Sequence, residues 1–224
     1  MELIKPNLVQ AEKTAVELFN EIENRKLIVS GKDEKTLNNE IFSLAKELFG
    51  IEKHWHKRIV RAGENTLHPY SENPSNRIIQ DDDILFFDFG PIIDKWEADL
   101  GRTYVIGNDP QKHKLKNDIE SAWHETKIWF EEKTNLKASE LFEFVKNKAR
   151  EYGWEFGGEI GGHLIGEFPH EQLEPENHPL YIHPENNNNM FDLDDNGNKR
   201  HWILELHFID KEQKIGAFYE QLLT

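Results

Sequence analysis

The chain has 224 residues and a mass of 26.4 kDa, enough for one large domain with a hydrophobic core. Its 42 acidic residues outnumber 27 lysines and arginines, and the net charge of -15 argues against a nucleic-acid partner or an anionic membrane surface. The absence of cysteine excludes thiolate catalysis, cysteine-bound zinc and disulfides. No long apolar run and no signal peptide are visible, so we expect a soluble, cytoplasmic protein.

Two amphipathic helices are expected first. Pro6 suits the first turn of a helix, and apolar residues then recur on one face. These residues are Leu8, Ala11, Ala15, Phe19 and Ile22. A second helix follows with Asp33 as its N-cap and Gly50 after its last turn. Its apolar positions are Leu37, Ile41, Leu44 and Leu48.

The rest of the chain alternates between strands and helices. A short strand is expected within 51–63, with Arg58, Ile59 and Val60 before its turn, and it precedes an antiparallel pair, 84–89 and 96–106. Helices are expected over 111–133 and 138–152. The asparagine-rich stretch 183–200 is typical of an exposed loop, and 202–209 and 214–223 form a hairpin. The order indicates two similar α/β halves.

Two aspartates lie inside apolar strand sequences. Asp88 occurs in ILFFDFG and Asp99 in WEADLGRT. An ionised carboxylate in such a strand needs a compensating charge unless it faces solvent. Alternation places Asp88 on the side of Phe86 and Asp99 on the side of Gly101, so both face one point if the strands pair. Alone, each also fits a solvent-facing strand residue.

Three further residues suit the same site. His163 lies in GGHLIGEFPHE, where glycines allow close approach of the backbone, while Glu205 and Glu220 lie in the two strands of the last hairpin. A structural histidine and two edge-strand charges are the alternatives for each residue taken alone. Four carboxylates and one imidazole together suit a pair of divalent ions.

These motifs carry a resemblance over nearly the whole chain. RAGENTLHPY, DDDILFFDFGPIIDKWEADLGRTYVIG, GGHLIGEFPHE and the two final glutamates occur in the order found in M24 family metallopeptidases. That group includes methionine aminopeptidase, Xaa-Pro aminopeptidase, prolidase and creatinase. The resemblance implies an α+β pita-bread fold with two pseudo-symmetric halves around a dinuclear metal site. It also implies one metallopeptidase domain over 1–224, without the separate N-terminal domain of larger members.

The resemblance also implies roles for individual residues. The metal ligands would be Asp88, Asp99, His163, Glu205 and Glu220. Asp99 and Glu220 would bridge two divalent ions, with Mn²⁺ favoured and Co²⁺, Fe²⁺ or Zn²⁺ as alternatives. A metal-bridging hydroxide would attack the peptide carbonyl. Glu205 would handle the proton, His170 would steady the tetrahedral intermediate and His68 would lie on the substrate side.

The function favoured by this resemblance is that of a metallo-exopeptidase acting on short peptides, as an Xaa-Pro aminopeptidase or dipeptidase. Methionine aminopeptidase is the nearest alternative, followed by a hydrolase of a small amidine and a non-catalytic binding protein. The chain departs from the family at Leu164, where a glycine is usual, and at Leu206, where a proline is usual. It also lacks an arginine just before Glu220. A homodimer is suggested only by analogy.

Two groups of aromatic residues are expected to have ordinary roles. Trp123 and Trp129 are interpreted as core or subunit-contact residues of the helix over 111–133. His54 and His56 flank Trp55, and their spacing of two on a strand also fits an adventitious metal site, but we expect both to lie on the solvated surface.

Overall fold

The computed structural model of the protein describes residues 4–169 and 178–224. The first half contains α1 (Ile4–Asn24), α2 (Glu34–Phe49), β1 (Ile59–Ala62), the 3-10 helix η1 (Gly63–Leu67), β2 (Ile84–Phe89), β3 (Ile92–Ile93), β4 (Trp96–Glu97) and β5 (Leu100–Val105). The second half contains α3 (Pro110–Glu131), α4 (Ala138–Glu151), β6 (Glu155–Phe156), η2 (His178–Leu180), β7 (Ile203–Asp210) and β8 (Ile215–Leu222).

The main sheet confirms the two similar halves. Its six antiparallel strands run in the order β1-β2-β5-β8-β7-β6. Each half contributes two helices and then three of these strands, and the order of strands in the second half mirrors that in the first. The halves therefore meet where β5 pairs with β8, at the centre of the sheet.

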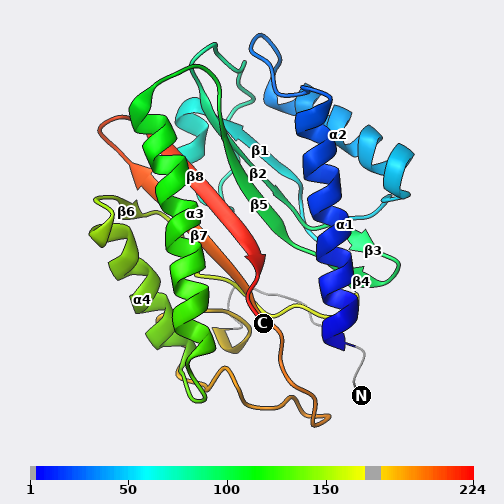
Figure 1. Cartoon of the computed structure of the whole chain (residues 1–224), viewed down its shortest axis with the longest axis vertical. Coiled ribbons are helices and arrows are strands. Elements are labelled where there is room, and N and C mark those ends of the chain that lie inside the picture. Colours follow the sequence, from blue (N-terminus) through cyan, green and yellow to red (C-terminus); the bar gives the residue numbers. More distant parts are fainter. Residues whose placement is uncertain (1–3, 170–177) are drawn as a thin grey trace.

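The helices cover one face of this sheet, as Figure 1 shows for α1 and α3. Each half has its own core. Phe87 and Phe89 of β2 pack against Phe19 of α1, while Leu204 and Phe208 of β7 belong to the core beneath α3 and α4. Because side chains alternate along a strand, the intervening residues point to the uncovered face. That face carries the polar residues described below.

The helix ends follow the expected signals. Asp33 accepts a hydrogen bond from the Thr36 backbone N–H at the start of α2, and Gly50 ends that helix with a φ of 66°. The expected apolar stripe is wrong at one position, because Leu48 is 40% exposed while Ala45 is buried. All the expected apolar positions of α1 are buried.

The stretch 96–106 is not one strand. Trp96–Glu97 pairs with Ile92–Ile93 in a separate two-stranded ribbon, and β5 begins only at Leu100. Asp99 therefore lies at the entry to β5 rather than inside a continuous strand. The loop over 183–200 is only partly exposed, because Asn186 and Met190 are buried. No helix among the residues described has the length and apolar character needed to cross a membrane.

Trp123 joins α3 to β7 on the helix-covered face of the sheet. Its side chain is 1% exposed, and its indole N–H donates to the Leu204 carbonyl at 2.8 Å. Replacement of Trp123 by Phe leaves that carbonyl without its donor, so we expect the free energy of unfolding to fall by about 1–3 kcal/mol. Urea denaturation measures the change. Trp129→Phe is the matched control, because Trp129 is half-buried and stacks on Phe144. Equal losses in both variants would contradict this role.

Candidate metal centre

Three acidic residues and a glycine form one row across the middle of the sheet. Asp88 of β2 lies opposite Gly101 of β5, Gly101 opposite Glu220 of β8, and Glu220 opposite Glu205 of β7. Directly opposed residues in antiparallel strands point to the same face. The register therefore brings Asp88, Glu220 and Glu205 to one side of the sheet, the side that the helices leave uncovered.

Gly101 leaves the space at the centre of this row. A Cβ atom at this position would lie 2.5 Å from the ring of Phe218 and 2.9 Å from the Cβ of Glu220. Asp99 lies two residues earlier and is 2% exposed, so alternation directs it to the same side of the sheet from the start of β5. The expectation that Asp88 and Asp99 face one point is thus met by the geometry.

His163 reaches the centre from a segment that runs beside β7. Its backbone carbonyl accepts from the Ile203 N–H, and its ring Nε2 lies 3.0 Å from Asp99 Oδ2. The preceding Gly162 has a φ of 134°, and a Cβ there would lie 2.0 Å from the Ile203 carbonyl oxygen. Only glycine fits this close approach, which places the imidazole against the carboxylates.

His56 also lies among these carboxylates, so the prediction that it lies on the solvated surface is wrong. Its side chain is 7% exposed, and Nε2 lies 3.1 Å from Asp99 Oδ1 and 3.5 Å from Asp88 Oδ1. The chain bends at Trp55 and His56 instead of continuing as a strand, so the spacing of two does not put both histidines on one surface. His54 is partly buried near Phe42 and Phe89.

The ligand-type atoms fall into two clusters that share Asp99. One contains His56, Asp88 and Asp99, and the other contains Asp99, His163 and Glu220. Within each cluster these atoms lie within 4.8 Å of one another. Glu205 lies next to the second cluster as the register partner of Glu220. The structure therefore brings together all five residues that the sequence nominated as metal ligands, with His56 in addition.

Without a cation, burial destabilises the ionised form of these carboxylates and shifts their pKa values. Burial raises the pKa of Glu205 to about 7 and that of Asp88 to about 6, although nearby imidazoles oppose the shift. Burial and then the neighbouring carboxylates raise the pKa of Glu220. Burial also disfavours the charge of Asp99, but His56 and His163 outweigh it and lower the pKa of Asp99.

One buried atom shows directly that the residues fit a cation. Glu220 Oε2 is buried and has no hydrogen-bond partner, although a buried carboxylate oxygen without a donor is costly. Four carboxylates and two imidazoles supply hard and borderline donors suited to divalent metals. Two divalent ions would also balance the four negative charges.

Of the two other expected catalytic residues, the structure describes only His68. His68 is half-exposed and pairs through Nδ1 with Glu72, while its carbonyl accepts a hydrogen bond from Arg61. Its turn lies close to the centre, because the Tyr70 ring is 5.7 Å from the His56 ring. The other residue, His170, falls outside the described residues.

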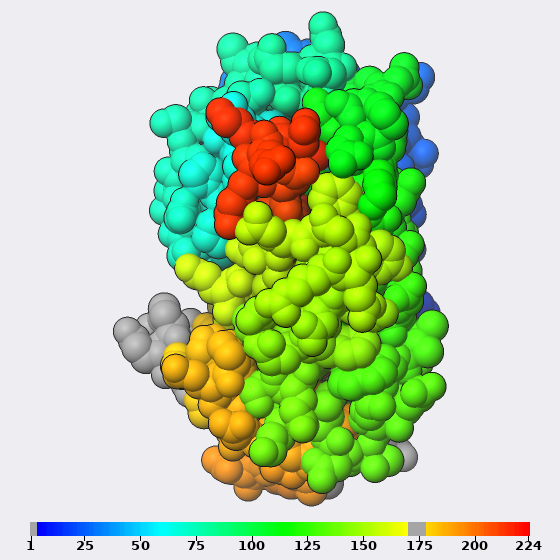
Figure 2. Space-filling model, turned by 90° about the vertical axis from the view of Figure 1, so that its left-hand side faces the viewer, coloured from blue at the N-terminus to red at the C-terminus, as the bar shows by residue number. Residues whose placement is uncertain are grey.

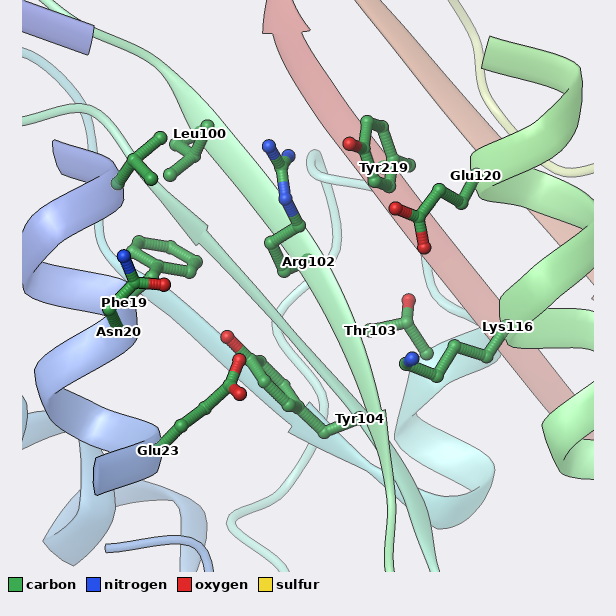
Figure 3. A pocket seen from close by; sticks show the side chains of 11 residues that line it. Phe19, Asn20, Glu23, Leu100, Arg102, Thr103, Tyr104, Lys116, Glu120 and Tyr219 are labelled. Carbon is green, nitrogen blue, oxygen red and sulfur yellow. The ribbon is translucent and has the colours of Figure 1, made fainter. Parts of the chain in front are cut away.

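A separate cavity of about 260 Å³ lies on the helix-covered side, between α1 and α3. Figure 3 shows Arg102, Tyr104 and Tyr219 around it. The Arg102 guanidinium lies 4.0 Å from the centre of the Tyr219 ring, as strand alternation from Gly101 requires. This cavity is therefore not part of the carboxylate cluster.

In the side view the outline is indented on the side away from α1, between the surface near η1 and that of residues 180–190 (Figure 2).

Comparison with known proteins assigns the chain to a family. The model of the metallopeptidase family M24 matches residues 7–196, so the chain belongs to this family. The match includes Asp88, Asp99 and His163, and it ends before Glu205 and Glu220. These two glutamates are placed instead by their register in the sheet. A curated relative, the Xaa-Pro dipeptidase of Pyrococcus horikoshii, is 28% identical over 154 residues.

Solved structures confirm the fold class. The Xaa-Pro dipeptidase from Bacillus anthracis has a TM-score of 0.77 at 19% identity, covering 100% of this chain and 61% of its own. The dipeptidase from Pyrococcus horikoshii has a TM-score of 0.74 at 24% identity, covering 97% and 58%. The methionine aminopeptidase from Rickettsia prowazekii has a TM-score of 0.70 at 13% identity, covering 96% and 90%. The expected pita-bread fold is therefore confirmed.

The chain spans only part of the dipeptidases that it matches. The aligned region covers 64% of this chain and 40% of the curated Xaa-Pro dipeptidase.

The buried acids predict how stability depends on pH when metal is removed. The pKa values of Asp88 and Glu205 rise to about 6 and 7, and that of His56 rises to about 9 because Asp99 and Asp88 outweigh its burial. The folded state then holds more protons than the unfolded state, so its stability falls as pH increases from about 5 to about 8. Thermal unfolding in a chelator measures this fall.

Glu205→Gln is the control for this experiment, because it removes one of the groups that titrate. We expect a flatter pH dependence in that variant, and a flatter one in the wild type with Mn²⁺ present. A melting temperature of the metal-free protein that increases steadily over the same range would contradict the electrostatics described here.

Proposed function

We propose that this protein is a dinuclear metal-dependent exopeptidase that cleaves short peptides with proline next to the scissile bond. The single observation that carries the proposal is the row of carboxylates across β2, β8 and β7, joined by Asp99 and His163. Membership of the M24 family supports it. Residues 1–224 would act as one catalytic domain.

The residues that would hold the two ions are Asp88, Asp99, His163, Glu205 and Glu220. Asp99 and Glu220 would be shared between the ions, in keeping with the place of Asp99 in both clusters. Such a pair of ions, with Mn²⁺ favoured, would supply an activated water and polarise the carbonyl of the scissile bond.

Glu205 is the group suited to hold the proton of the attacking water. It lies at the β7 end of the row and is partly exposed, and burial raises its pKa to about 7. A carboxylate whose pKa lies near the working pH both accepts and releases a proton readily. His68 lies on a turn that Arg61 fixes beside Tyr70, which suits contact with a bound peptide. His170 would stabilise the developing oxyanion.

The preference for Xaa-Pro peptides rests on the curated relative and on the dipeptidase structures named above. Methionine aminopeptidase is the second candidate. The aminopeptidase from Rickettsia prowazekii supports it, because the alignment with this chain covers 90% of that protein.

A peptide panel distinguishes the candidates. We expect the metal-free protein to be inactive, and Mn²⁺ or Co²⁺ to restore cleavage of Ala-Pro or Ala-Pro-Ala, measured by release of alanine. Cleavage of the dipeptide alone identifies a dipeptidase, and cleavage of the tripeptide identifies an aminopeptidase. Cleavage of Met-Ala-Ser alone would contradict the Xaa-Pro preference. Inactivity on every peptide, with metal bound, would contradict peptidase function.

Glu205→Gln tests the role of the proton-holding group. We expect kcat to fall by about 10²–10⁴-fold, because the amide does not accept the proton. Glu212→Gln is the control, since Glu212 lies in the turn between β7 and β8 and is exposed. Equal activity of Glu205→Gln and the wild type would contradict this role.

A further inference from the structure

His56 takes a place in the centre that the five expected ligands do not account for. Its Nε2 atom lies 3.1 Å from Asp99 Oδ1, and His163 Nε2 lies 3.0 Å from Asp99 Oδ2. Each imidazole therefore contacts a different oxygen of the Asp99 carboxylate. His56 also approaches Asp88, as His163 approaches Glu220 at 3.8 Å.

The orientation of His56 matches that of His163 in a second respect. The His56 ring Nδ1 donates to the Lys57 carbonyl at 2.7 Å, and the His163 ring Nδ1 donates to the Leu164 carbonyl at 2.8 Å. In both residues the partner is the carbonyl of the next residue. A histidine that ligates a metal commonly donates its other N–H to a carbonyl, which fixes the ring and leaves its remaining nitrogen facing the ion.

The fold holds the His56 ring in this position. The Trp55 backbone N–H donates to the Gly90 carbonyl, which joins this segment to the end of β2. A Cβ at Gly90 would lie 2.3 Å from His56 Nε2 and 2.4 Å from Trp55 Nε1, so the absent side chain makes room for both rings. Trp55 in turn donates to the Ala98 carbonyl and lies between His56 and His163.

We propose that His56 is a sixth metal ligand, which completes a cation position with Asp88 and Asp99. The inference rests on the proposed dinuclear centre and extends it. Each of the two cation positions then has one imidazole, and Asp99 lies between them. The five residues implied by the family resemblance would give an imidazole to only one position.

A second imidazole changes which metals the centre prefers. Imidazole favours Zn²⁺, Fe²⁺ and related ions, whereas carboxylates alone suit Mn²⁺. The position next to Asp88 should therefore bind Co²⁺ or Zn²⁺ better, relative to Mn²⁺, than a position built only from carboxylates.

Another histidine cluster in the described part of the chain differs in this orientation. His178, His183 and Glu185 lie close enough to hold an ion, but His183 Nδ1 accepts the Glu185 backbone N–H, and His178 Nδ1 already pairs with the Glu185 carboxylate. These nitrogens are engaged within the cluster itself. His178→Gln is therefore a suitable control for binding outside the centre.

The test uses the full-length protein, stripped of metal and titrated with Co²⁺ against a competing chromophoric chelator. We expect the wild type to bind two ions and His56→Phe to bind one of them more weakly, by at least the roughly 10–100-fold that loss of an outer-shell partner costs. The loss for Mn²⁺ should be smaller. His56→Gln, which keeps an N–H donor toward Asp99, should not restore the affinity, and His178→Gln should leave both sites unchanged.

X-ray absorption at the cobalt edge gives a readout that does not depend on the variants folding. One imidazole per cobalt in the wild type supports the inference, and about half that number overturns it. Unchanged Co²⁺ affinity in His56→Phe, or full rescue by His56→Gln, also overturns it while leaving the peptidase proposal intact. Failure of the wild type to bind any Co²⁺ would instead overturn the proposed function together with this inference.

Discussion

The repulsion among four neighbouring carboxylates, three of them buried, is the constraint on which the metal centre depends. Two like charges about 4 Å apart repel by about 4 kcal/mol at an effective dielectric constant of about 20, and a domain has only about 5–15 kcal/mol of stability. Several such pairs cannot all stay ionised unless positive charge lies among them. In the protein alone, burial and then neighbouring carboxylates raise the pKa values of Asp88, Glu205 and Glu220, and Glu220 Oε2 has no hydrogen-bond partner.

The sheet sets these charges side by side through its register rather than through long loops. Because β5 and β8 meet in the middle of the sheet, strands from both halves contribute to one row, and the missing side chain of Gly101 makes room for Phe218 and Glu220 of β8. The helices cover the opposite face and supply the apolar cores. The fold thus separates the two tasks: stability comes from one face of the sheet, and chemistry comes from the other.

Much of this could be predicted from the sequence. Apolar periodicity identified the four long helices and the last hairpin, and alternation placed Asp88 and Asp99 on one side of the paired strands. His56 could not be placed, because its direction depends on a bend at Trp55 and on the vacancy at Gly90, which is distant in sequence. Only the folded chain brings Gly90 close to the rings of Trp55 and His56. A histidine beside a tryptophan gives no periodic signal that would reveal it.

The central claim is that these oxygens and imidazoles hold two divalent ions, and a crystal structure grown with Mn²⁺ and measured at the manganese absorption edge tests it most directly. The account predicts two anomalous peaks, one between Asp88 and Asp99 and the other between Asp99, His163 and Glu220. Absence of both peaks, or a single peak at His178 and His183 with none among the carboxylates, would contradict it.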